Sequence, residues 1–189
     1  IIRPAILWTD QRSKAEVDWL KENCLQTIMD ETLNVPNTVW TLPQLMWIRR
    51  NEPQNWDKIH KVLFAKDYLR YRITGTIETD NIDAAGSMFY DVKNECWSRN
   101  ICGICGIKEE WLPKLCDPTD IVGNVTASAA KEFCLSQDTT VLVGTTDTVM
   151  EVFAAGNVEA GDTTVKLATA GRICVITDRP IDSKFIFNY

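Results

Sequence analysis

The run TTVLV at residues 139–143 constrains the fold most. Its β-branched and apolar side chains are typical of a buried strand, and the small residues GTT at 144–146 follow it directly. Asp147 comes next, and a helix is expected over residues 148–155, ended by Gly156 at a position where helices commonly carry glycine. A buried strand that leads directly into a helix predicts an α/β arrangement.

The rest of the chain supports a mixed α/β fold class. Two further strands are expected at residues 162–168 and 172–177, joined through the turn Thr169-Ala170-Gly171. No repeat or linker divides the chain. The other expected elements are helices at 12–24, 43–50, 68–73 (with Asp67 as N-cap), 97–105 and 127–134, short strands at 62–64 and within 117–125, and a loop at 79–86.

Both ends of the chain are apolar. Residues 1–8 are expected to form a strand that has nothing before it to pair with, and residues 185–189 stop within an apolar run. The sequence therefore favours a piece of a longer protein, with exposed apolar ends that promote self-association and allow a homodimer.

Composition limits the partners. The chain has 189 residues, 45% of them hydrophobic, and a formal net charge of -6 without a long Lys/Arg run, which argues against nucleic acid. No apolar stretch approaches the ~20 residues that cross a bilayer, and no leader pattern precedes one. We expect a cytoplasmic protein that makes no membrane contact.

The seven cysteines are an odd number and mostly lie in apolar patterns. The one close pair, Cys102 and Cys105, has the spacing of a redox pair or of half a metal site. No second CxxC exists, and His60 is the only histidine. Reduced core or loop thiols are therefore the favoured interpretation, no metal site is expected, and His60 is assigned no chemistry.

Asp147 has two interpretations. A carboxylate beyond the carboxyl end of a strand can accept the proton of a substrate hydroxyl. An aspartate before a helix is also a common N-cap, which needs no ligand and is the simpler interpretation on spacing alone.

Two other segments carry groups that suit a ligand. The turn Thr169-Ala170-Gly171 offers N–H groups and a hydroxyl to a phosphate, although many hairpin turns look similar. Trp8, Asp10 and Arg12 place an aromatic ring, a carboxylate and a guanidinium before a helix, which suits sugar hydroxyls. The alternative for this second segment is that Asp10 caps the helix and Arg12 pairs with a neighbouring acid.

Seven segments, taken together and in order, resemble the FGGY family of carbohydrate kinases, and within it the pentulose kinases such as xylulokinase. The resembling stretches are residues 8–12 (WTDQR), 66–75 (KDYLRYRITG), 79–87 (TDNIDAAGS), 111–113 (WLP), 122–126 (VGNVT), 143–147 (VGTTD) and 167–171 (LATAG).

This resemblance implies a fold, a reaction and a set of site residues. The fold would be ribonuclease H-like, as in actin-like ATPases and sugar kinases, with residues 1–189 forming part of the N-terminal sugar-binding domain and a separate nucleotide domain elsewhere. The reaction would transfer the γ-phosphoryl of ATP, with Mg²⁺, to a sugar hydroxyl. The family pattern makes Asp147 the general base, Trp8, Asp10 and Thr148 sugar contacts, and Thr169 and Gly171 ATP phosphate contacts.

Two positions depart from that pattern. Thr148 stands where xylulokinases usually carry Asn, and Ala168 begins a turn that is usually Gly-Thr-Ser-Gly. A pentulose is the expected substrate, with glycerol, gluconate or a hexulose as alternatives within the family and a non-catalytic sugar sensor as the alternative outside enzymes. The chain alone is expected to lack kinase activity and ATP affinity, because the triphosphate and the hydroxyl must be held in line between two domains.

Overall fold

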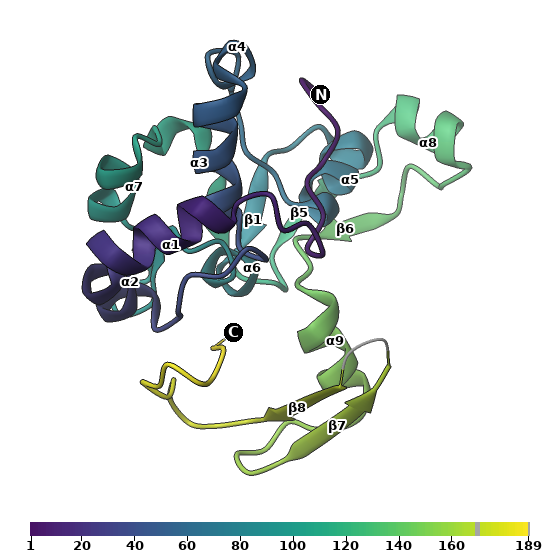
Figure 1. The fold of residues 1–189 in the computed structure, drawn as a ribbon. Helices are drawn as coiled ribbons and strands as arrows, with labels where there is room; N and C mark the ends of the chain where they lie inside the picture. Colours follow the sequence, from purple (N-terminus) through teal and green to yellow (C-terminus); the bar gives the residue numbers. More distant parts are fainter. Residues whose placement is uncertain (169–170, 189) are drawn as a thin grey trace.

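Much of the first two thirds of the chain (Figure 1) packs on a main hydrophobic cluster drawn from residues between Leu20 and Leu112, and a smaller cluster forms at Ala84, Ala85 and Tyr90. The structure is a computed structural model that describes residues 1–168 and 171–188, so Thr169, Ala170 and Tyr189 lie outside it. The helices that pack on this core are α1 (Lys14–Asn23), α2 (Leu25–Thr32), α3 (Thr41–Asn51), α4 (Pro53–Trp56) and α7 (Arg99–Cys105). Val17 and Leu20, three residues apart on α1, are both buried, as helical spacing requires.

Strand pairs and short helices continue the chain. The strand β1 (Glu78–Asp80) runs parallel to β4 (Lys114–Cys116), whereas the other pairs are antiparallel. These pairs are β2 (Tyr90–Asp91) with β3 (Cys96–Trp97), β5 (Ile121–Asn124) with β6 (Thr140–Leu142), and β7 (Thr163–Leu167) with β8 (Gly171–Val175). The remaining helices are α5 (Ala65–Thr74), α6 (Asn81–Ala85), the 3₁₀ turn Glu109–Trp111, α8 (Ala127–Phe133) and α9 (Asp147–Ala154).

The β7–β8 hairpin stands away from the main core and is joined to it through α9 (Figure 1). Its apolar side chains are largely exposed, with Leu167 at 89% and Ile173 at 70%. The C-terminal segment then returns to the helical part. There the backbone N–H of Asn188 donates to Asn34 Oδ1 at 2.9 Å, and the Phe187 ring packs edge-on against Trp40 with 5.4 Å between ring centroids. Within the described part of the apolar run, residues 185–188, Phe187 therefore packs against the chain, whereas Phe185 is 86% exposed.

Several sequence predictions are confirmed. The helices α1, α3, α7, α8 and α9 and the β7–β8 hairpin form within a few residues of their expected bounds. Gly106 and Gly156 follow α7 and α9 with φ of +69° and +82°, a conformation that glycine adopts without strain.

Other local predictions are wrong. Residues 62–64 form no strand, because the Val62 N–H donates to the Trp111 carbonyl oxygen at 2.9 Å instead of joining a ladder. Residues 1–8 are likewise not a strand, since they have no partner strand. The predicted loop at 79–86 contains the end of β1 and all of α6, and α2 was not anticipated. The strand over 139–143 forms as β6, but Leu142 is 48% exposed, so it is not buried.

Asp67 is also placed differently from its prediction. The helix α5 begins at Ala65 with Phe64 at its N-cap, so Asp67 lies inside the first turn. Its buried carboxylate pairs with Lys66 and Arg70, and these ion pairs replace the expected capping role.

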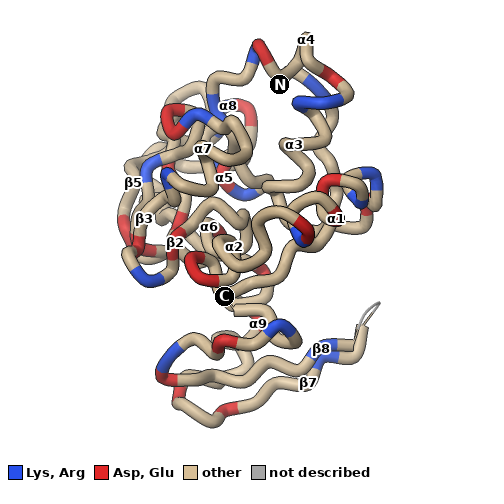
Figure 2. Tube along the Cα trace, turned by 60° about the vertical axis from the view of Figure 1, so that its left-hand side comes forward, with Lys and Arg blue, Asp and Glu red and all other residues tan. Residues whose placement is uncertain are grey.

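Figure 2 shows charged residues of both signs interspersed along the trace. In the ranges 1–168 and 171–188, no helix has both the length and the apolar character needed to cross a membrane.

Candidate functional site

Asp147 begins α9 directly after β6 and the connecting segment 143–146. Thr146, not Asp147, is the N-cap, because its Oγ1 accepts the Val149 N–H at 3.3 Å. The capping interpretation of Asp147 is therefore wrong. Its carboxylate is exposed and accepts the Thr148 N–H at 2.7 Å, in the first turn of a helix, where the macrodipole favours negative charge.

The segment before Asp147 is held mainly through its backbone. The Val143 and Gly144 N–H groups each donate at 2.9 Å to carbonyl oxygens of the 118–120 turn. Arg70 Nη1 donates to the Val143 carbonyl oxygen at 2.6 Å. Gly144 has φ of +74°, which a side chain would strain, so glycine permits the sharp exit from β6.

A buried ionic cluster lies beside this segment. Lys66 Nζ is within 2.6 Å of Asp67 Oδ1, 2.8 Å of Asp80 Oδ2 and 3.3 Å of Asp83 Oδ2. Arg70 Nη1 pairs with Asp67 Oδ1 at 2.9 Å. The Thr145 hydroxyl donates to Asp80 Oδ1 at 2.8 Å, which links the cluster to the segment that carries Asp147.

Burial changes the proton affinity of this cluster. Desolvation raises the pKa of Asp83 to about 6; the charge of Lys66 opposes that rise and those of Asp80 and Asp67 add to it. Burial by itself lowers the pKa of Lys66, but its hydrogen bonds to Asp67 and Asp80 outweigh this and raise that pKa overall. Lys66 is therefore a protonated cation among three carboxylates.

The hairpin approaches the first turn of α9 through Arg172. This side chain, on β8 directly after Gly171, donates to Thr148 Oγ1 and pairs with Glu151 at 2.9 Å. Glu151 is also 2.6 Å from Lys166 on β7. The structure thus brings Asp147, Thr148 and the start of β8 together, whereas Thr169 lies outside the described residues.

Trp8 and Asp10 lie in the segment before α1. Trp8 is 61% exposed, and Asp10 Oδ2 is 2.7 Å from Arg12 Nη2. Hydrogen bonding from Arg12 lowers the pKa of Asp10. Ser13 occupies the N-cap position of α1, so Asp10 does not cap that helix. The expected pairing of Arg12 with a neighbouring acid is present, and Asp10 is that acid. Within the described ranges, no hydrogen bond or ion pair joins Trp8 or Asp10 to Asp147.

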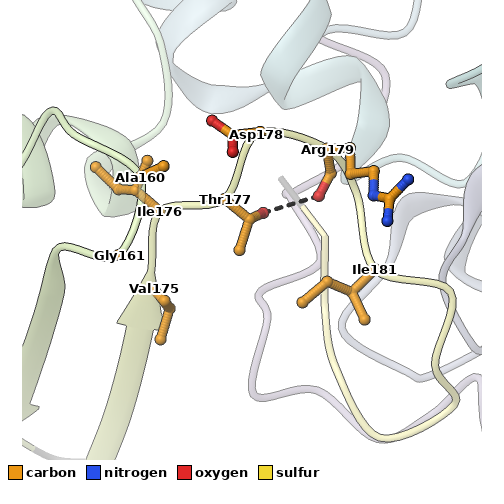
Figure 3. A pocket seen from close by; sticks show the side chains of 8 residues that line it. All are labelled: Ala160, Gly161, Val175, Ile176, Thr177, Asp178, Arg179 and Ile181. Carbon is orange, nitrogen blue, oxygen red and sulfur yellow. Dashed lines mark hydrogen bonds between the residues drawn. The ribbon is translucent and has the colours of Figure 1, made fainter.

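The surface pockets lie elsewhere. A shallow, open pocket of about 370 Å³ is lined by the turn before β7, the end of β8 and the segment that follows it (Figure 3). In that segment the Thr177 hydroxyl donates to the Arg179 carbonyl oxygen at 2.9 Å. A second one, of about 470 Å³, lies beside Trp97. Asp147 lines neither of these two pockets, and its side chain is exposed.

The cysteines divide by burial. Cys24, Cys102 and Cys105 are buried free thiols, whereas Cys96 and Cys134 are exposed free thiols, in agreement with the predicted mixture of core and loop thiols. Burial raises the pKa of Cys102 to about 11 and that of Cys105 to about 12, which suppresses their reactivity. Over residues 1–168 and 171–188 no group of three His, Cys, Asp or Glu residues is arranged to hold a metal ion.

Sequence patterns indicated some site residues and missed others. Thr145, Asp80 and Arg172 were not singled out, although Asp80 lies within the TDNIDAAGS stretch. The sequence did contain one signal for the ionic cluster: Lys66 and Arg70 are four positions apart, which places two cations on the same face of α5.

Comparison with known proteins identifies the family. Residues 1–154 match the model of the FGGY family of carbohydrate kinases, N-terminal domain. The chain is 30% identical over 183 residues to a xylulose kinase of Lactococcus lactis, covering 97% of this chain and 36% of that protein. It is 34% identical over 172 residues to a xylulose kinase of Escherichia coli, covering 90% and 35%.

A solved structure supports the same assignment. The crystal structure of a kinase from Brucella ovis, titled a xyloylose kinase, superposes with a TM-score of 0.84 at 32% identity, over 91% of this chain and 35% of that one. The chain thus spans about a third of the relatives it matches, and the expected sugar-kinase fold is confirmed. The sequence and the structure together place this chain in the FGGY family of carbohydrate kinases, within its N-terminal domain.

Proposed function

We propose that residues 1–189 are part of the N-terminal, sugar-binding domain of a longer kinase, which transfers the γ-phosphoryl of ATP to a hydroxyl of a pentulose such as xylulose. The family match supports the reaction class, and the relatives named xylulose kinase support the substrate. The observation that carries the proposal is the exposed carboxylate of Asp147, which follows a strand and is not used as a helix cap.

In this proposal Asp147 is the general base. A sugar hydroxyl has a pKa far above 7, so it becomes an effective nucleophile only if a nearby carboxylate accepts its proton as the phosphoryl group arrives. The O–H bond breaks toward Asp147, the sugar oxygen bonds to phosphorus, and ADP leaves with the former bridging oxygen. Mg²⁺ bound with ATP would offset the negative charge of the phosphates during transfer.

The other candidate residues take supporting roles. Thr148, Trp8 and Asp10 contact the sugar, while Thr169 and Gly171 contact the phosphates from the hairpin turn. The bond from Arg172 to Thr148 supports this division, because it holds the beginning of β8 against the first turn of α9. The open position of Asp147 also fits a site that a second domain must cover to exclude water.

Substitution of Asp147 by Asn in the full-length protein tests the base. We expect kcat to fall by roughly 10²- to 10⁴-fold, the typical contribution of a general base, with KM for the sugar within about tenfold of wild type. Thermal stability should change little, because Thr146 provides the cap. Steady-state kinetics with ATP and a panel of xylulose, glycerol, gluconate and hexuloses also identifies the substrate.

Thr126→Val is the matched control. Thr126 caps α8 by accepting the Ala129 N–H, so its loss should cost about 1 kcal/mol of stability and leave kcat unchanged. Near-normal turnover in the Asp147 variant would refute the assignment of the base, and a wild-type protein that phosphorylates none of these compounds would refute the kinase function.

A further inference from the structure

We propose that Asp80 is a positioning residue that holds the segment carrying Asp147 in place through the hydroxyl of Thr145. This inference rests on the proposed function, since it assigns to Asp80 the placement of the base. The contact joins residues 65 positions apart, at 2.8 Å between Thr145 Oγ1 and Asp80 Oδ1.

Asp80 is itself rigidly held. Its side chain is fully buried at the end of β1, where it caps α6 by accepting the Asp83 N–H at 3.1 Å. Its other oxygen lies 2.8 Å from the ammonium group of Lys66. The carboxylate is thus fixed by two helices, because Lys66 belongs to α5 and Asp83 to α6.

Thr145 occupies the one position where side-chain bonding can fix the middle of the segment. Val143 is held through its backbone by Arg70, and Thr146 is held by the cap of α9. Between these two anchors, the N–H of Gly144 bonds to the 118–120 turn, and the hydroxyl of Thr145 bonds to Asp80. A hydrogen bond to an ionised acceptor in a buried setting is stronger than a neutral one, so this contact limits movement just before Asp147.

Small displacements of a base affect the rate more than they affect binding. A shift of about 1 Å in a catalytic group can lower a rate by roughly 10²-fold, because the reacting atoms leave their near-attack arrangement. If Asp80 acts through Thr145, loss of the hydroxyl should therefore lower kcat more than it raises KM for the sugar.

The test uses Thr145→Val, which removes the hydroxyl and nearly preserves volume, and Thr145→Ser, which keeps it. Thr126→Val is the control, because it removes an equally part-buried hydroxyl that donates to the Ile73 carbonyl oxygen at 3.1 Å, away from Asp147. Each variant of the full-length protein is measured for kcat, KM, melting temperature and hydrogen–deuterium exchange in peptides that cover residues 143–150.

We expect Thr145→Val to lower kcat by roughly 10- to 100-fold, with KM within about threefold and faster exchange in residues 143–150. Thr145→Ser should recover most of the lost rate. Thr126→Val should leave both kcat and the exchange of residues 143–150 unchanged. Wild-type exchange and rate in Thr145→Val, or an equal rate loss in the control, would overturn the positioning role.

The exchange data separate this inference from the proposed function. A full-length protein without kinase activity would refute the proposed function. Even in that case, unchanged exchange in Thr145→Val would overturn the inference that the bond between Thr145 and Asp80 holds the segment before Asp147. Conversely, normal kinase chemistry with full rate in Thr145→Val would overturn the positioning inference alone.

Discussion

Neutralising Asp83 should make the protein more stable at neutral pH and leave it unchanged in acid. Asp83 lies among Lys66, Asp67 and Asp80, and burial raises its pKa from 3.8 to about 6. Between pH 3.8 and about pH 6, Asp83 is therefore protonated in the native protein but ionised in the unfolded protein. The associated stabilisation is complete below about pH 3.8 and is lost as the pH rises through about 6.

The size of the effect follows from the shift. One pKa unit corresponds to about 1.4 kcal/mol, so the whole change amounts to about 3 kcal/mol, of which some is lost to solvent screening because the side chain is 21% exposed. The Asp83→Asn side chain is neutral at every pH. Relative to wild type, this variant should gain about 2 to 3 kcal/mol in the free energy of unfolding between pH 4 and pH 7.5.

Urea unfolding followed by tryptophan fluorescence, at intervals between pH 4 and pH 8, measures this difference. Asp18→Asn, at an exposed position on α1 and outside the ionic cluster, is the control for removing one carboxylate from the surface. A difference between the Asp83 variant and wild type that stays constant with pH would show that the attraction of Lys66 cancels the effect of burial on the pKa of Asp83, and a difference that falls as the pH rises would show that Lys66 outweighs burial. Either result would refute the raised pKa of Asp83.

Two further predictions concern the thiols and the hairpin turn. Cys24, Cys102 and Cys105 are buried, so they should react with a thiol reagent at pH 8 only after unfolding, whereas the exposed Cys96 should react in the native protein. A count of seven fast-reacting thiols in the native protein would contradict this prediction, as would stoichiometric zinc found by elemental analysis. Thr169→Val should raise KM for ATP and lower kcat/KM by an amount equivalent to about 1.5 to 3 kcal/mol, while wild-type kinetics for ATP would make the turn structural only.

Local sequence patterns accounted for the elements that are stabilised locally. The helices α7 and α8 follow from their caps, Ser98 and Thr126, and from the glycine or left-handed residue at each C-terminal end. The β7–β8 hairpin follows from β-branched alternation on both sides of a turn. The helix caps depend on neighbours within about four residues, and the hairpin pairs residues no more than twelve positions apart, so both are visible in one sequence.

Long-range contacts decided the elements that the patterns misplaced. Residues 62–64 have the composition of a strand, yet they bond to the turn at Trp111, and the parallel partner of β1 lies 36 positions away in β4. Asp67 resembles a cap in sequence, but it is buried and pairs with Lys66, which also pairs with Asp80 on β1, fourteen positions along the chain. The free energy of such contacts depends on which distant groups meet, and sequence spacing does not specify that.

The candidate site divides in the same way. The sequence by itself determined that Asp147 follows a strand and small residues, and its ordered motifs indicated the FGGY family. Only the tertiary structure decided that Arg172 bonds to Thr148 and that Thr145 bonds to Asp80. The physical reason is that a hydrogen bond or an ion pair requires two groups within about 3 Å, and these partners are brought together by the packing of α5, α6, α9 and β8 rather than by their order along the chain.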